Sequence, residues 1–410
     1  MIGEGLAAAR PGDDRLGVWC GWVLIGAAAF TPLLGWLIPL WFAGLLALVG
    51  LLCFPAVRIT ERDRPAAIIL FAALIWAAVS TTWSPYHPSK PGNSGILKLA
   101  FELPLYWSAI AATRRADPAL RTRALHVLAF GCALFGLVLV VDAVTHAALY
   151  KALHVYYQPI RPDLAESNVG HSTQVLGLIW PLAACGGPKR WRPWLALAMI
   201  AGTGAAAVAF GYDAPLIGLV LAPLTALAVW RWPRAAPVTL AVTAAGVFLA
   251  APVLVWLVRR FFDYPALERA MPKTDSMRLD YWSHALDWIA VRPLRGWGLD
   301  ASRMFGPGIR LHPHNIPLQV WMELGVVGAV AAAAFWFVAF MRLAGPSRSL
   351  AAAAAAASCV VYLLFGLNFG VWQEWWLGLG ALVAVMAVAN AAAHPGSELP
   401  RPSTSAPILE

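Results

Sequence analysis

Long apolar runs alternate along the chain with short segments that carry most of the charge, proline and glycine. An α-helix needs about 20 apolar residues to cross the hydrocarbon core of a bilayer. The runs therefore predict an all-α polytopic membrane protein with about 12 transmembrane helices. We expect these spans at 17–34, 37–56, 65–83, 95–113, 124–149, 171–187, 194–211, 214–230, 238–257, 317–341, 350–368 and 375–393.

The spans divide the chain into five parts. Residues 1–16 form a segment expected in the cytoplasm, 17–257 hold spans one to nine, and 317–393 hold spans ten to twelve. Between them lies one large loop, 258–316, which is expected outside the membrane. The tail, 394–410, is rich in proline and serine and is predicted to be disordered and cytoplasmic. No small-residue cleavage site follows the first run, so we expect an uncleaved anchor.

The basic residues of the short loops predict the orientation. With the N-terminus in the cytoplasm, 17 of them fall in inside segments. Only 4 fall in short outside segments, namely Lys90, Lys98, Lys151 and Arg161. Because Lys and Arg concentrate in cytoplasmic loops, both termini are expected in the cytoplasm.

Composition agrees with a membrane protein, since 60% of the residues are hydrophobic and 12% are charged. The net charge of +9 could indicate nucleic-acid binding. However, no soluble segment carries a basic stripe interleaved with aromatic residues, so no nucleic-acid partner is expected. The five cysteines lie inside apolar runs without paired spacing and are predicted to be small core residues.

The large loop carries the remaining nine basic residues, and long loops escape the topology rule. Within it, residues 276–290 are predicted to form an amphipathic helix on the membrane face. Its apolar positions are Met277, Tyr281, Trp282, Leu286 and Ile289. The basic side chains could bind a ligand, or they could hold anionic lipid headgroups. On the second interpretation, residues such as Arg269 and Arg303 only touch lipid.

A polar segment opens the tenth span. It begins His312-Pro-His-Asn and places Asn315, Gln319 and Glu323 four residues apart, on one face of a helix. Polar groups in hydrocarbon cost several kcal/mol when unsatisfied, so ionisable residues at a membrane helix end indicate a functional site. The alternative is a capped helix with a buried stripe of hydrogen bonds.

Other ionisable residues fall at the same predicted side of the membrane. They are Lys98, Glu102, Asp142, His146, Asp213 and Glu374. A transporter more often places its polar residues near the midplane, at broken helices. The one-sided distribution therefore favours a site that faces the periplasm.

Several of these segments together resemble the O-antigen ligase and polymerase superfamily of Gram-negative bacteria. The pattern His314-Asn-x-x-Leu-Gln-x-x-x-Glu-Leu-Gly-x-x-Gly is similar to its hallmark segment. Arg278, followed by Arg292-Pro-Leu-Arg-Gly-Trp-Gly, resembles the helix and turn of its large periplasmic loop. Arg161, upstream of Ser167-Asn-Val-Gly-His, resembles its smaller loop. One departure is Gly211-Tyr-Asp-Ala-Pro, where the family often has a basic residue.

The resemblance implies an enzyme of the bacterial inner membrane with a periplasmic active site. It implies transfer of O-antigen polysaccharide from undecaprenyl diphosphate to lipid A–core, without a cofactor and among membrane lipids. Histidine suits a general base near neutral pH, and arginine suits a diphosphate. We expect His314 as the base, His312 as the second choice or an orienting neighbour, and Arg161 and Arg278 on the diphosphate. The supporting residues would be Asn315, Glu323 and Asp213.

Three alternatives stay open at this stage. The same lipid-linked donor would serve an O-antigen polymerase, so the catalytic residues do not separate it from a ligase. A lipid-linked oligosaccharide flippase is a second possibility. Third, His312 and His314 could hold zinc, but a catalytic zinc site needs another protein ligand. Glu323 lies about 13 Å along the helix from His314, at 1.5 Å per residue, which is too far.

Overall fold

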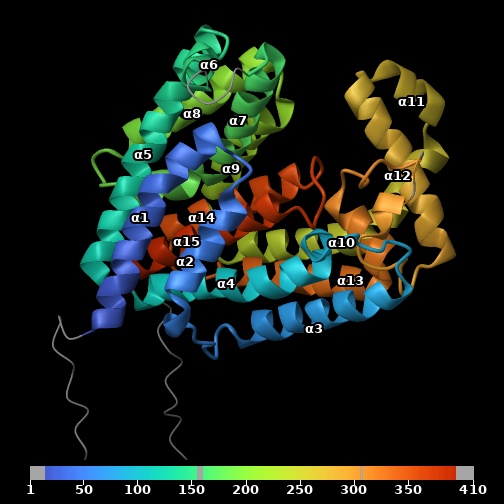
Figure 1. Cartoon of the computed structure of the whole chain (residues 1–410), viewed down its shortest axis with the longest axis horizontal. Coiled ribbons are helices and arrows are strands. Elements are labelled where there is room, and N and C mark those ends of the chain that lie inside the picture. Colours follow the sequence, from blue (N-terminus) through green and yellow to red (C-terminus); the bar gives the residue numbers. More distant parts are fainter. Residues whose placement is uncertain (1–13, 155–159, 305, 307, 394–410) are drawn as a thin grey trace, which may run out of the picture.

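The protein is an all-α polytopic membrane protein. The computed structural model describes residues 14–154, 160–304, 306 and 308–393, and it is helical throughout this part, without a strand (Figure 1). The helices are α1 (Arg15–Leu37), α2 (Phe42–Leu52), α3 (Arg64–Ser80), α4 (Gly95–Arg115), α5 (Pro118–Val144), α6 (Ala148–His154), α7 (Pro162–Gly186), α8 (Arg192–Phe210), α9 (Asp213–Arg231), α10 (Ala235–Phe261), α11 (Tyr264–Ala270), α12 (Lys273–Val291), α13 (Ile316–Met341), α14 (Leu350–Phe365) and α15 (Glu374–Ala393). Short 3₁₀ turns are η1 (Phe54–Ala56), η2 (Thr81–Trp83), η3 (Pro91–Asn93) and η4 (Ala301–Met304).

Each of the twelve predicted spans falls on a helix. Nine helices of the described chain are long and apolar enough to cross a membrane. The others are α2 and α14, which are shorter apolar helices, and α7, which begins with a polar segment around Asp163. Several predicted boundaries are wrong. Helix α7 begins at Pro162 rather than at 171, and α2 begins at Phe42 rather than at 37. Helix α5 begins at Pro118 rather than at 124 and ends at Val144, before the separate helix α6. The predicted tail lies outside the described residues, as does most of the segment 1–16.

One end of the helix bundle gathers arginines from the predicted inside segments. The buried carboxylate of Asp63 is bonded to Arg114 at 2.5 and 3.0 Å and lies 3.6 Å from Arg342. Nearby in the fold, Arg115 forms an ion pair of 2.6 Å with Asp14. These contacts join the starts of α1 and α3 to the ends of α4 and α13. The starts of α1 and α3 therefore lie at the same end of the fold as the ends of α4 and α13, as the predicted inside segments require.

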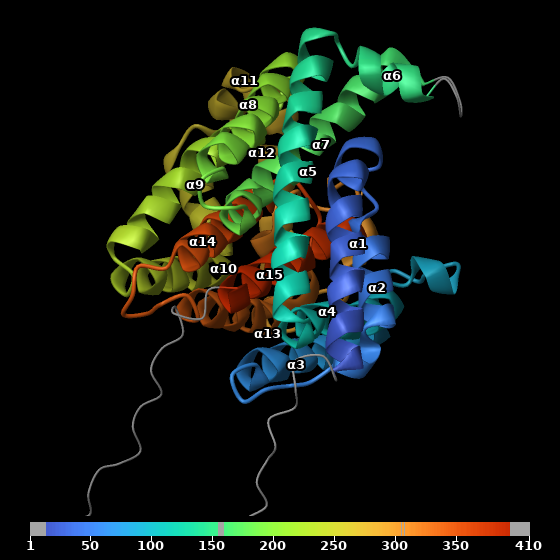
Figure 2. The ribbon, with the colours of Figure 1, turned by 90° about the vertical axis from the view of Figure 1, so that its left-hand side faces the viewer.

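At the opposite end, the helices splay into two groups (Figures 1 and 2). In Figure 1, α1, α5 and α7 run upward toward α6, whereas α3, α4, α10 and α13 run to the right, toward α11 and α12. The centre of the main core is α7, of which every residue from Ser172 to Gly186 is buried. Of the five cysteines, four are buried and Cys359 is half-buried, all without a disulfide. Their predicted packing role is confirmed.

Candidate active site

The polar segment 312–315 sits where α13 begins, and Asn315 explains why the helix starts there. Its side-chain Oδ1 accepts a hydrogen bond of 3.1 Å from the backbone N–H of Leu318, which is the typical geometry of an N-cap. The next backbone N–H, from Ile316, donates to the carbonyl of Gly366 at 3.0 Å, just after α14. Asn315 therefore shapes the helix mouth, and it is buried there.

His314 is held in one orientation by the segment after α14. Its backbone has φ = 52°, a left-handed conformation that is costly for a residue other than glycine and is often found at functional sites. Its Nδ1 lies 2.8 Å from the carbonyl oxygen of Asn368. A carbonyl can only accept, so Nδ1 carries the proton and Nε2 keeps the lone pair in the neutral ring. Nε2 is thus the nitrogen that can accept a proton.

His312 is arranged differently, because both of its ring nitrogens are engaged. Nδ1 accepts the backbone N–H of His314 at 3.2 Å, and Nε2 lies 3.3 Å from the amide of Gln373. A neutral imidazole cannot accept at both nitrogens, so we assign the proton to Nε2 and turn the Gln373 amide so that its oxygen, rather than its nitrogen, faces Nε2. Burial, followed by the nearby His314 and Arg303, lowers the pKa of His312 to about 3.

The helix α12 covers the two histidines from the large loop. The indole of Trp282 donates to the carbonyl of Pro313 at 3.0 Å, and the ring of Tyr281 stacks on His314 with centroids 6.1 Å apart. Burial lowers the pKa of His314, a hydrogen bond to Asn368 raises it, and the cation of Arg278 lowers it. The predicted amphipathic helix is thus present, and it brings Arg278 to His314. Arg278 also pairs with Asp275 at 2.9 Å.

The stripe on α13 is a buried hydrogen-bond network. Glu323 has no exposed surface, and its carboxylate accepts from Gln319 at 3.0 Å, from the backbone N–H of Asp300 at 2.8 Å and from the indole of Trp372 at 2.6 Å. Gln319 in turn accepts the N–H of Val371 at 2.9 Å. Glu323 and Asn315 were expected to support the site; their side chains are bonded within the fold, and a contact with substrate stays a prediction.

A break in α13 explains the glycines of two motifs. Gly325 has φ = 64° and ψ = −161°, so the helix kinks there and leaves backbone groups unpaired. The turn 292–298 supplies hydrogen-bond donors to these backbone groups. The N–H groups of Trp297 and Gly298 donate to the carbonyls of Met322 and Glu323 at 2.9 and 2.7 Å. A Cβ on Gly296 would lie 2.4 Å from the backbone carbonyl oxygen of Glu323. Glycine is therefore required where the loop turn meets the broken helix.

Two predicted site residues lie elsewhere. Arg161 precedes α7, is bonded to Asp163 at 2.5 and 3.0 Å, and its side chain is 74% exposed. Helix α7 begins next to α6, while α12 stands at the other side of Figure 1, so the two arginines do not meet in this structure. Asp213 is exposed at the start of α9. Its neighbour Tyr212 donates to the carbonyl of Ser167 at 3.2 Å.

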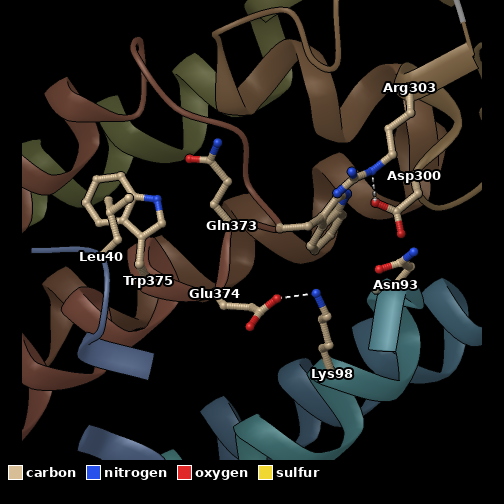
Figure 3. Close-up of a pocket in the computed structure, with 10 residues that line it drawn as sticks. Leu40, Asn93, Lys98, Asp300, Arg303, Gln373, Glu374 and Trp375 are labelled. Carbon is tan, nitrogen blue, oxygen red and sulfur yellow. Dashed lines mark hydrogen bonds and ion pairs between the residues drawn. The ribbon is translucent and has the colours of Figure 1, made fainter. Parts of the chain in front are cut away.

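A polar pocket of about 310 Å³ is shown in Figure 3, and one of its lining residues, Gln373, contacts His312. Its lining residues are Leu40, Asn93, Gly95, Lys98, Asp300, Arg303, Trp372, Gln373, Glu374 and Trp375. Lys98 pairs with Glu374, and Arg303 pairs with Asp300 at 3.0 Å. Arg303, which on the headgroup interpretation would touch only lipid, pairs with Asp300 and lines this pocket. Sequence reasoning also missed Asp300, Trp372 and Gln373. The available signal for Gln373 was its place beside Glu374, between the last two predicted spans.

The histidine pair does not form part of a larger ligand cluster. Throughout the described ranges, no three His, Cys, Asp or Glu side chains are grouped as a metal site would require. The rings of His312 and His314 lie with centroids 4.2 Å apart and are held by protein hydrogen bonds. Independence from metal stays a prediction.

Comparison with known proteins gives a family likeness in the region of this site. Residues 194–333 match the family described as O-antigen ligase, a range that includes Arg278, the turn 292–298 and the polar segment of α13. Three relatives, from Rickettsia conorii, Rickettsia felis and Rickettsia prowazekii, carry the name "putative polysaccharide ligase" and are each 26% identical.

These matches cover part of each protein. The alignment with the Rickettsia conorii relative extends over 124 residues, 27% of this chain and 30% of that protein. For the Rickettsia felis and Rickettsia prowazekii relatives, the alignments cover 30% and 31% of their lengths. The resemblance predicted from the histidine segment is nevertheless confirmed, since residues 194–333 are similar to the family described as O-antigen ligase.

Proposed function

We propose that this protein is a periplasm-facing glycosyltransferase that moves O-antigen polysaccharide from undecaprenyl diphosphate to lipid A–core. The family likeness and the names of the relatives support a polysaccharide ligase. The observation that carries the chemistry is the fixed tautomer of His314. Its Nδ1–H bond to Asn368 leaves Nε2 ready to accept a proton. A transfer to a sugar hydroxyl needs such an acceptor.

In this proposal His314 is the general base and His312 is a positioning residue. The acceptor hydroxyl attacks the anomeric carbon of the donor sugar while its proton passes to His314 Nε2, and the diphosphate leaves. His312 fixes the backbone of His314 and has no lone pair left for the substrate, because its Nδ1 accepts the His314 N–H. The lowered pKa of His314 keeps the base neutral at the pH of the periplasm.

Arg278 is assigned to the leaving diphosphate. A guanidinium stays charged and can donate two parallel hydrogen bonds to phosphate oxygens. Arg278 lies close enough to His314 to lower its pKa. Arg161 stays the second candidate for this contact, and it would reach the donor only if the start of α7 approached α12. Asp213 is proposed to orient an arginine or a hydroxyl from the start of α9.

The proposed location is the bacterial inner membrane, with both termini in the cytoplasm. The arginine-rich end around Asp63 would then face the cytoplasm. His312, His314 and the polar pocket lie at the other end of α13 and would face the periplasm. Membrane lipids surround the helices, and no nucleic-acid partner is proposed.

The test is transfer by purified protein supplied with lipid-linked O-antigen and lipid A–core. The ligase proposal expects glycan on lipid A–core, whereas a longer lipid-linked glycan would indicate a polymerase. In liposomes, translocation without transfer would indicate a flippase. His314→Ala should lower kcat by about 10²–10⁴-fold, the usual contribution of a general base. His312→Ala should retain more activity, and a more severe loss in His312→Ala than in His314→Ala would reverse the assignment.

A further inference from the structure

We propose that the pocket beside His312 is the subsite for a sugar residue of the acceptor glycan. This inference rests on the proposed transferase function and adds where the acceptor binds. The pocket is formed by the starts of α4 and α15, the turn around Asp300 and the segment before α15. All of its lining residues lie outside 194–333, apart from Asp300 and Arg303.

The charges of the pocket favour a neutral polyol over a phosphate. Its two cations are each matched by a carboxylate: Lys98 by Glu374, and Arg303 by Asp300 (Figure 3). A phosphate would have to displace these partners, and the carboxylates would repel it. Sugar hydroxyls both donate and accept, so they can bind beside a paired cation and carboxylate without separating them. Charged partners also give the stronger hydrogen bonds.

The pocket is amphipathic, as a sugar ring requires. Figure 3 shows Leu40 and Trp375 together at one end, and Asn93, Asp300 and Arg303 at the other. A pyranose has apolar C–H faces and a polar rim, so it can lie against the first group and hydrogen-bond to the second. The volume, about 310 Å³, is at the lower end of the roughly 300–1,000 Å³ of small-molecule sites. It has room for a short part of a glycan.

The fold holds Asp300 in place in the pocket wall. Asp300 has φ = 61°, and its backbone N–H donates to the buried Glu323 carboxylate at 2.8 Å. A Cβ on Gly95 would lie 2.3 Å from the Asp300 Oδ2, so the missing side chain lets Asp300 approach the start of α4. Such strained backbone persists only where the surrounding structure enforces it. Asp300 is therefore fixed in the pocket before any ligand arrives.

The pocket is joined to the proposed base through the histidine pair. Gln373 lines the pocket, and its amide lies 3.3 Å from His312 Nε2. His312 Nδ1 in turn receives the backbone N–H of His314. Arg303 also lines the pocket and is close enough to act on the charge of His312. A glycan held here would place its chain beside the proposed base.

The test variant is Glu374→Gln, which removes the carboxylate that pairs with Lys98. Two probes separate the ligand classes: the dephosphorylated oligosaccharide released from lipid A–core by mild acid, and inorganic phosphate. Binding to detergent-solubilised full-length protein is measured by nuclear magnetic resonance without donor. We expect the Kd for the oligosaccharide and the KM for lipid A–core to rise about tenfold, with the donor KM unchanged. Lys90→Ala, an exposed change outside the pocket, is the control.

The opposite results overturn the inference. A phosphate site would bind inorganic phosphate more tightly in Glu374→Gln, because Lys98 is uncovered, and would change the donor KM. Oligosaccharide binding that is absent in the wild type, or equal in the wild type and Glu374→Gln, also refutes the sugar subsite. If the wild type binds the oligosaccharide and Glu374→Gln weakens it, but no transfer occurs, the sugar site stands and the transferase proposal fails. Lys98→Met with Glu374→Gln, which removes both charges of the pair, should bind the oligosaccharide weakly and phosphate not at all.

Discussion

Replacing Arg278 tests the proposed chemistry at two points, because its guanidinium would bind the diphosphate and also acts on His314. Arg278→Lys keeps the positive charge and loses the planar fork of donors. Arg278→Ala loses both. We expect Arg278→Lys to affect donor use alone, and Arg278→Ala to affect donor use and the pH dependence of transfer.

The size of the donor effect follows from the surroundings of Arg278. A charge-assisted hydrogen bond is worth about 1.5–3 kcal/mol, or roughly ten- to a hundredfold in kcat/KM. The Arg278 side chain is 33% exposed, so solvent screens the contact and the lower half of that range applies. We expect a loss of about tenfold for Arg278→Lys and a greater loss for Arg278→Ala. Arg269→Ala, at the exposed end of α11, is the control.

The pH effect has a definite sign. The base must be neutral, so activity is present above the pKa of His314 and is lost as the pH falls through it. The pKa of His314 lies below 6.5, first because the ring is buried and also because Arg278 is near. Removing the cation raises this pKa, so the acid limb of kcat/KM moves to higher pH in Arg278→Ala. In Arg278→Lys it should stay in place.

The assay is initial-rate transfer at saturating lipid A–core over a pH series, with donor concentration varied. An acid limb that is the same in the wild type, Arg278→Lys and Arg278→Ala would separate Arg278 from His314 and refute this account. Equal losses of kcat/KM in Arg269→Ala and Arg278→Ala would show that any positive charge in the large loop has the same effect, and that Arg278 makes no specific contact. Arg161→Ala in the same series tests whether the second arginine reaches the donor.

Three further outcomes are expected. Glu323→Ala should lower the thermal stability, since three buried donors lose their acceptor at about 1–3 kcal/mol each; an unchanged melting temperature would contradict the network. Gly325→Ala should impair folding, because its Cβ would lie 2.3 Å from the Leu294 carbonyl, whereas Gly246→Ala, with open space around it, should not. Equal melting temperatures for these two variants would count against the strained kink. Transfer should continue in EDTA and without ATP, and inhibition by EDTA that zinc reverses would instead revive a metal role for His312 and His314.

The helices could be predicted from the sequence because hydrocarbon imposes a length and a polarity on each span. The first, fourth and tenth predicted spans illustrate this, as α1, α4 and α13 match their predicted ranges closely. The start of α7 was missed because Asp163 and Glu166 make its first turns polar, so an apolar run cannot report them. A short helix such as α11 leaves even less signal.

The site was predictable only in part. His312, His314 and Arg278 were found because polar residues at a helix mouth and arginines in a loop are unusual in such a chain. Glu323 shares that signal but serves the fold, and only its three buried partners show this. The place of Arg303 in the pocket could not be predicted from the sequence, because Lys98 and Glu374, which line the same pocket, are far away in the chain.

The hydrogen bonds between the turn 292–298 and the broken helix α13 have a consequence for protein engineering. The turn supplies donors that the kink at Gly325 needs, and the kink supplies the space that Gly296 occupies. The large loop is therefore not a cassette that can be exchanged between relatives at the ends of α10 and α13. A chimera that imports the loop must import residues 316–328 with it, because the two segments form one interlocked unit.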